Sequence, residues 1–150
     1  MNQRYGFLTN QEIFDKVLTG IRRQGGPSVA PDILACRYRS AAGKQVLACS
    51  IGQLIPDNAY DSSWDRAEIS SVDCLLDKEN FHMALFEAGV NVDDRGTVDF
   101  LINLQRVHDT AALEAGGPNF SVPFFEGFEP HMKELAARYG LCYKQQENTQ

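Results

Sequence analysis

The stretch from Leu34 to Tyr60 constrains the fold most, because it contains the clearest β-hairpin signal in the chain. Two strand-like segments flank a run of small residues, in the order LACRYRSAAGKQVLACS. A tight turn at Ala42-Gly43 would join the segments as neighbouring antiparallel strands. We therefore predict a hairpin in which residues 34–39 pair with residues 45–49.

The position of this turn determines which residues face one another. A two-residue turn at Ala42-Gly43 places Cys36 opposite Cys49 and Arg39 opposite Val46. Because successive side chains of a strand point to opposite faces, the hairpin then has one apolar face and one basic face. The apolar face would hold Cys36, Tyr38, Leu47 and Cys49, and the basic face would hold Arg37 and Arg39.

Helical signals lie on both sides of the hairpin. The stretch Thr9-Asn10-Gln11-Glu12 is a capping box, and apolar residues at helical spacing follow it until Gly25-Gly26-Pro27. The other helices expected from such spacing cover residues 50–55, 77–88, 97–111 and 130–139. Ser50 and Thr97 are the expected caps of two of these helices.

These elements together predict a single α+β domain over residues 1–150, with the hairpin packed against about four helices. A chain of 150 residues has the usual size of one domain, and its 43% hydrophobic content is sufficient for one core. No repeat and no linker divides the chain. The polar end of the chain, residues 144–150, is expected to be disordered.

The charge and the lengths of the apolar runs argue against two classes of partner, nucleic acids and membranes. Residues 1–50 carry seven Lys and Arg against three Asp and Glu, whereas residues 51–150 carry seven against seventeen. A net charge of −6 disfavours non-specific nucleic-acid binding, which needs a broad basic face. No apolar run approaches the roughly 20 residues that cross a bilayer, so no membrane association is expected.

The cysteines point to a reducing compartment. Cys36, Cys49, Cys74 and Cys142 are scattered and form no C-x-x-C pair. The first residues, MNQRYGFLTNQE, lack the basic and apolar regions of a signal peptide. We therefore expect free thiols and a cytoplasmic location, which is the host cytosol if a phage encodes the chain.

Several motifs, taken in order, resemble a group of small uncharacterised proteins of phages, prophages and bacteria. These motifs are TNQEIFDKV, CRYR, ACSIGQLIPDNAY, FLINLQRVHD and ELAARYGL, and they span nearly the whole chain. Relatives in this group often carry a second Cys or His near the position of Gln53, which this chain lacks. No activity attaches to the group. The resemblance therefore implies a mobile-element setting, in which a host protein is the expected partner.

Cys49 is a candidate nucleophile, since it ends a predicted strand just before a predicted helix. His108 and Asp109 would supply a base and its orienting carboxylate, as in several cysteine hydrolases. Adjacent helical residues point about 100° apart, however, so Asp109 is not expected to orient the His108 ring. Cys49 also falls on the apolar hairpin face. We favour structural roles for Cys49 and His108, and a cysteine-dependent hydrolase is an alternative.

A second candidate site would bind a small anion such as a nucleotide. Its residues are Arg37, Arg39, Lys44, Ser50 and Gly52. The turn from Ser50 to Gly52 leads from a strand into a helix, where free N–H groups bind anions, and arginine pairs well with phosphate. The competing interpretation is that Arg37 and Arg39 lie on the exposed side of the sheet and pair with acidic side chains from the later helices.

No metal and no cofactor is expected. His82, His108 and His131 lack the spacing of metal ligands, and the chain contains no phosphate-binding G-x-x-x-x-G-K-[ST] motif. Three aspartates, Asp57, Asp61 and Asp65, stand four residues apart. We interpret them as a solvated acidic segment.

A cluster of phenylalanines is the third candidate. Phe120, Phe124, Phe125 and Phe128 lie within nine residues. They either pack in the core under the last helix or form an exposed patch for a protein partner or a homodimer. The sequence therefore favours a protein that acts by binding rather than by catalysis. The first hypothesis is a host-protein partner at this patch, and the alternative is a small anion held by Arg37 and Arg39.

Overall fold

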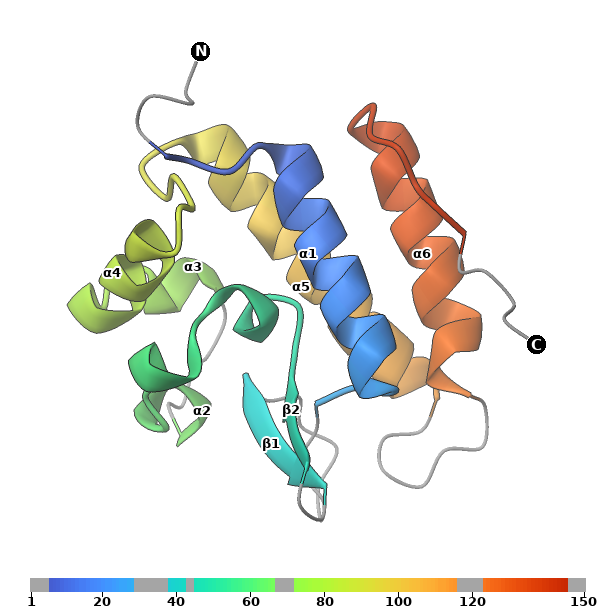
Figure 1. Cartoon of the computed structure of the whole chain (residues 1–150), viewed down its shortest axis with the longest axis horizontal. Coiled ribbons are helices and arrows are strands. Elements are labelled where there is room, and N and C mark those ends of the chain that lie inside the picture. Colours follow the sequence, from blue (N-terminus) through green and yellow to red (C-terminus); the bar gives the residue numbers. More distant parts are fainter. Residues whose placement is uncertain (1–5, 29–37, 43–44, 67–71, 116–122, 146–150) are drawn as a thin grey trace.

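The structure, a computed structural model, describes residues 6–28, 38–42, 45–66, 72–115 and 123–145 (Figure 1). Three long helices lie side by side: α1 (Asn10–Gln24), α5 (Arg95–Glu114) and α6 (Phe124–Arg138). The strands β1 (Arg39–Ala42) and β2 (Gln45–Ala48) lie with the shorter helices beside this group. The predicted α+β fold, a hairpin packed against helices, is confirmed.

The hairpin is antiparallel, as predicted, but its predicted register is wrong by two residues. Arg39 pairs with Ala48 and Ala42 pairs with Gln45, so residues 43–44 separate the strands instead of Ala42-Gly43. An even shift keeps every side chain on its predicted face. Residues 34–37 of the predicted strand lie outside the described residues.

Helix α1 begins and ends where the sequence predicts. The Thr9 hydroxyl accepts the N–H of Glu12 at 3.1 Å, and the Glu12 carboxylate accepts the N–H of Thr9 at 2.9 Å. Gly25, with φ of 84°, ends the helix in the left-handed conformation. One face is buried through Ile13, Phe14, Val17, Leu18 and Ile21. Each such side chain contributes about 1.5–3 kcal/mol when fully buried, so this stripe anchors the helix.

Two helix starts differ from the prediction. Helix α5 is capped by Asp94, whose carboxylate accepts the N–H of Thr97 at 2.9 Å, so Thr97 is not the cap. Helix α6 begins at Phe124 and continues through Pro130, where the sequence suggested a start. An interior proline costs about 3 kcal/mol or more, and the burial of Phe124 and Phe128 offsets this cost. The predicted helix end at Gly140 is confirmed by its φ of 66°.

Shorter elements connect the hairpin to α5 along the chain. They are η2 (Gly52–Leu54), η3 (Asp57–Ala59), α2 (Ser63–Arg66), α3 (Val72–Leu75) and α4 (Glu79–Glu87). The fully buried Trp64 joins them, because its ring lies edge-on to Phe81 at 5.0 Å and to Tyr60 at 5.7 Å. Tyr38, next to β1, meets the same Phe81 ring at 5.6 Å. This aromatic group connects the hairpin to α4.

The C-terminal segment is tied to α1 by Gln11, which bonds the N–H and the carbonyl of Cys142, and by Arg22. Arg22 donates two hydrogen bonds to the Glu129 carboxylate of α6, at 2.7 and 2.8 Å, and a third to the carbonyl of Lys144 at 2.9 Å. The structure describes two residues of the tail that was predicted to be disordered, Lys144 and Gln145. The first of them is hydrogen-bonded to Arg22 through its carbonyl. Residues 146–150 lie outside the described residues.

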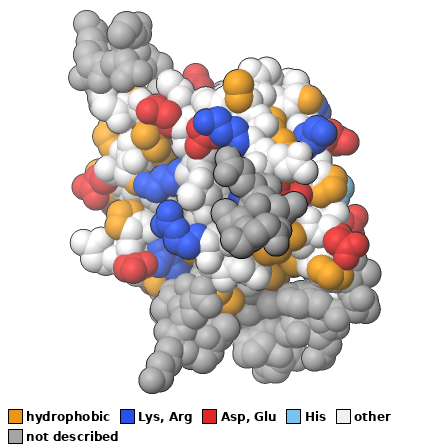
Figure 2. Space-filling model, turned by 45° about the vertical axis from the view of Figure 1, so that its right-hand side comes forward, with side chains coloured by type: hydrophobic (Ala, Val, Ile, Leu, Met, Phe, Trp, Pro, Cys, Tyr) orange, Lys and Arg blue, Asp and Glu red, His pale blue; other side chains and the backbone are white. Residues whose placement is uncertain are grey.

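The surface carries both signs of charge. Figure 2 shows Lys and Arg side chains at several places on the face in view, with acidic side chains among them. Within the described ranges, the structure contains no helix that is both long and apolar enough to cross a membrane.

Candidate functional site

The free edge of β2 is closed by glutamine side chains. The Gln24 amide of α1 accepts the N–H of Ala48 at 2.9 Å and donates to the Ala48 carbonyl at 2.8 Å. Gln53 donates to the same carbonyl at 2.9 Å and to the Gln24 oxygen at 2.8 Å. The Gln24 amide thus pairs with the strand as a neighbouring peptide unit would. These bonds hold α1, β2 and η2 together.

A polar network continues from η2 into α5. The N–H of Ile51 donates to the Gln105 oxygen at 3.1 Å, and the Gln105 amide donates to the Asp109 carboxylate at 2.9 Å. The same carboxylate oxygen lies 2.9 Å from Nδ1 of His108, a fully buried residue. The expectation that Asp109 would not orient the His108 ring is therefore wrong, because the Asp109 carboxylate lies within hydrogen-bond distance of Nδ1.

The other His108 nitrogen determines the tautomer of the ring. Nε2 lies 3.0 Å from the N–H of Ser28 and accepts its hydrogen. The ring proton must then reside on Nδ1, which donates to Asp109. Ser28 also contacts the hydroxyl of Ser40 in β1 at 2.8 Å, so the network reaches the hairpin. An Nε2 that already accepts a backbone N–H has no lone pair left to act as a base.

Cys49 is sealed inside this network. Its side chain is fully buried, and its sulfur accepts the N–H of Gly52 at 3.4 Å. Burial raises the pKa of the Cys49 thiol far above its ordinary value, and the negative charge of Asp109 raises it further. No hydrogen bond joins Cys49 to His108, although both residues are described. The neutral thiol favours the structural interpretation over a nucleophile.

At the predicted anion site, the Arg39 side chain is engaged by other groups of the protein. Arg39 pairs with Asp57 and donates to the carbonyls of Gly52 and Ile55. Its side chain is only 10% exposed, and the guanidinium lies 5.5 Å from the centre of the Tyr60 ring. The competing interpretation is confirmed in that Arg39 pairs with a later acidic side chain, but its placement of Arg39 on an exposed side of the sheet is wrong. Arg37 and Lys44 lie outside the described residues.

The turn after β2 offers no free donor between Ile51 and Leu54. Gln105 accepts the N–H of Ile51 and Cys49 Sγ accepts that of Gly52, while carbonyls accept those of Gln53 and Leu54. The predicted cap is wrong, because the buried Ser50 hydroxyl makes no hydrogen bond within the described residues. The N–H groups from Ile51 to Leu54 are therefore not available to an anion.

The three spaced aspartates have structural partners. Asp65 accepts the N–H groups of Tyr38, at 2.6 Å, and Arg39, at 3.2 Å, and it also accepts the Tyr60 hydroxyl. Asp61 accepts the N–H of Ser63 at 2.8 Å. The prediction of a solvated acidic segment is therefore wrong for Asp65, and only the tertiary contact with Tyr38 and Arg39 reveals its role. Within the described residues, no group of His, Cys, Asp and Glu could hold a metal ion.

The phenylalanine cluster is divided between core and surface. Phe124 and Phe128 are buried, with ring centres 5.1 Å apart, and Phe124 also lies 5.8 Å from the His108 ring. Their burial contradicts an exposed patch at these two rings, because α6 starts early enough to turn both toward α5. Phe125 is half-buried against them, and Phe120 lies outside the described residues.

A different apolar surface is exposed on α4. Within the described residues, the exposed large hydrophobic side chains are Met83 (40%), Phe86 (37%) and Leu113 (55%). Met83 and Phe86 are three residues apart on α4 and so are neighbours on its surface. The Phe7 ring lies edge-on to Phe86 at 5.4 Å, and His82 stacks on it at 6.5 Å. We call Phe7, His82, Met83 and Phe86 the α4 patch. Its signal in the sequence is the number of large apolar residues in the short helix α4, because one buried side cannot hold all of Phe81, Met83, Leu85 and Phe86.

Comparisons with known proteins provide no relative for this chain. No protein-family model, no curated protein and no solved structure matches it.

Proposed function

We propose that this protein acts without catalysis, by occupying the surface of another protein with the α4 patch. The observation that carries the proposal is the exposure of Met83 and Phe86, which stand together on one helix and are extended by Phe7. Exposed neighbouring apolar side chains on a small protein are characteristic of interaction surfaces. Methionine and phenylalanine are both enriched at the buried centres of such surfaces.

The charge around the α4 patch defines the kind of partner. Residues 77–94 contain five Asp and Glu and one Lys, a formal charge of −4. A partner that fits this segment presents an apolar centre surrounded by Lys and Arg, because unlike charges at the rim speed and orient association. The resemblance to the phage and prophage group supports a host protein as this partner.

The interior geometry supports binding over hydrolysis. Cys49 is buried with a raised thiol pKa, and both ring nitrogens of His108 are hydrogen-bonded, to Asp109 and to the N–H of Ser28. A hydrolase needs a thiolate and a free base at a site that substrate can reach. Neither group meets this requirement in the folded protein.

The test compares two apolar-to-serine variants for capture of proteins from a bacterial lysate. In M83S/F86S the α4 patch loses its centre, whereas L113S removes a single apolar side chain from α5 that is more exposed than either of these two. We expect a partner that binds wild type and L113S alike, and binds M83S/F86S at least tenfold more weakly, because central interface side chains carry most of the affinity. Raising the salt concentration should weaken the wild-type complex.

Two results would contradict this proposal. One is a partner whose affinity is the same for M83S/F86S as for wild type. The other is a wild-type homodimer, detected by sedimentation equilibrium, that M83S/F86S converts to monomer. In the second case the α4 patch serves a second copy of the chain. Circular dichroism and melting temperature of both variants verify that the fold is retained.

A further inference from the structure

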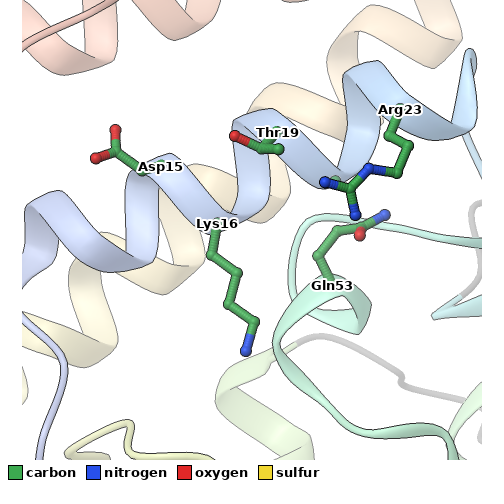
Figure 3. A pocket seen from close by; sticks show the side chains of 6 residues that line it. Asp15, Lys16, Thr19, Arg23 and Gln53 are labelled. Carbon is green, nitrogen blue, oxygen red and sulfur yellow. The ribbon is translucent and has the colours of Figure 1, made fainter.

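A second surface feature, independent of the α4 patch, lies on α1. An open pocket of about 390 Å³ is lined by Asp15, Lys16, Thr19, Gly20, Arg23 and Gln53 (Figure 3). Five of these residues come from α1, and Gln53 comes from η2. The volume is within the range of small-molecule sites, which is roughly 300–1,000 Å³.

The floor of this pocket depends on a missing side chain. A Cβ at Gly20 would stand 2.1 Å from the side-chain oxygen of Gln53, so only glycine lets that amide lie against the helix. Gln53 is held there by the hydrogen bonds that its amide nitrogen donates to Gln24 and to the carbonyl of Ala48. Its oxygen makes no hydrogen bond within the described residues and is available as an acceptor.

Two cations flank this floor without protein partners. Neither Lys16 nor Arg23 has an ion pair or hydrogen bond among the described residues, and both are exposed. Seven residues separate them, which is about two helical turns, so they lie on the same side of α1. Figure 3 shows the Arg23 guanidinium beside Gln53 of η2, and the Lys16 side chain extending from α1 below it. The neighbouring Arg22, in contrast, forms a bidentate ion pair with Glu129.

The acidic residue of the pocket does not neutralise them. The Asp15 carboxylate accepts a hydrogen bond from Gln11 at 2.9 Å. In Figure 3 it projects to the opposite side of α1 from the Lys16 amine and the Gln53 amide. The side of the pocket that faces η2 is therefore cationic in a chain that is acidic as a whole.

We propose that this pocket binds a small phosphate monoester that also carries hydroxyl groups, such as a sugar phosphate or a nucleoside monophosphate. The phosphate dianion would lie between Lys16 and Arg23, since guanidinium offers paired donors to phosphate and ammonium adds a point charge. A ligand hydroxyl would donate to the Gln53 oxygen. This site uses different residues from the anion site considered around Arg39.

The test uses adenosine 5′-monophosphate and ribose 5-phosphate as the two organic phosphates, and inorganic phosphate and adenosine as the matching fragments. Binding is followed in proton–nitrogen correlation spectra at low salt. We expect both organic phosphates to shift the Gly20 amide and the Gln53 side-chain amide, while adenosine shifts neither. K16A/R23A should weaken binding at least tenfold. The matched control is R106A/R138A, which removes two cations from a smaller open pocket between α5 and α6 and should leave affinity within twofold.

Three results would overturn the proposal. The first is an absence of binding by either organic phosphate at millimolar concentration. The second is an equal loss of affinity in K16A/R23A and R106A/R138A, which would show a general charge effect. The third is that inorganic phosphate binds as tightly as ribose 5-phosphate, because then the hydroxyl groups of the ligand make no contribution. Neither these outcomes nor their opposites bear on the α4 patch.

Discussion

At the scale of single residues, the two side chains considered for catalysis, Cys49 and His108, have structural roles. Cys49 fills the core and accepts a backbone N–H, and His108 bridges the loop at Ser28 to Asp109 on its own helix. Removing either His108 partner would leave a buried polar atom unsatisfied, at a cost of about 1–3 kcal/mol. Residue identity alone therefore says little about reactivity in this chain, because burial and hydrogen bonding decide it.

The accessibility of the thiols provides a prediction at this scale. In a variant with Cys36, Cys74 and Cys142 replaced by serine, Cys49 should react with a thiol probe at pH 7 only as fast as the protein unfolds. Burial and the raised pKa of this thiol keep it away from the probe and protonated. A variant that keeps only the exposed Cys142 should react within the mixing time. Rapid labelling of Cys49 in a fully folded sample would restore the hydrolase hypothesis.

At the scale of elements, η2 is the piece on which three others converge. Gln24 of α1 bonds Gln53, Arg39 of β1 donates to the Gly52 carbonyl, and Gln105 of α5 accepts the N–H of Ile51. Gly52 also approaches β1 so closely that a Cβ there would lie 2.3 Å from the Tyr38 carbonyl oxygen. Its lack of a side chain is what allows this short helix to pack beside the hairpin.

A pair of glycine substitutions tests this close approach. Gly52→Ala should lower the free energy of unfolding by roughly 2–3 kcal/mol, because the new methyl group meets a backbone oxygen that cannot rotate away. Gly26→Ala is the control, since its Cβ would have no atom within 4 Å. Urea titration followed by circular dichroism measures both. Equal stability of the two variants would mean that η2 does not need this contact.

At the scale of the whole molecule, one charged cluster ties the first helix to the last. Arg22, Glu129 and Tyr143 come from α1, α6 and the segment after α6. Burial by itself would raise the pKa of Glu129, but hydrogen bonds from Arg22 and Tyr143 and the charge of Arg22 lower it overall. The hydrogen bond with Glu129 likewise raises the pKa of Arg22 despite its burial. The cluster is therefore charged in the folded state.

The lowered pKa of Glu129 predicts a pH dependence of stability. The folded-state pKa lies below the ordinary value of 4.5, so the carboxylate stabilises the protein above that pH, and the contribution is lost as the pH falls below it. Glu129→Gln should therefore lower the melting temperature at pH 7, and the difference from wild type should shrink by pH 3. The effect at pH 7 should be roughly 1 kcal/mol, as for a partly exposed pair.

A carboxylate on the same helix serves as the control for this titration. Glu126 is exposed on α6, and Glu126→Gln should change the melting temperature little at either pH. A Glu129→Gln effect that is constant from pH 7 to pH 3 would show that the ionised carboxylate is not the source of stability.

Local interactions were sufficient to determine several elements from the sequence alone. The capping box at Thr9, the stop at Gly25 and the end at Gly140 act within one helical turn, so nearby residues specify them. Strand alternation likewise assigned Tyr38 and Cys49 to the buried face, even though the predicted register was displaced by two residues. The α+β class and the buried stripe of α1 follow from the same short-range patterns.

Only the tertiary structure decided what the polar and aromatic side chains do. Arg39 looked available for an anion until Asp57 and the Gly52 carbonyl were placed around it, and Asp65 looked solvated until Tyr38 approached. Phe128 entered the core because α6 packs on α5, while Phe86 remained outside because no described element covers it. Burial and hydrogen-bond partners at these positions are set by residues that are far apart in the chain. A local sequence pattern does not show which distant residues will come into contact.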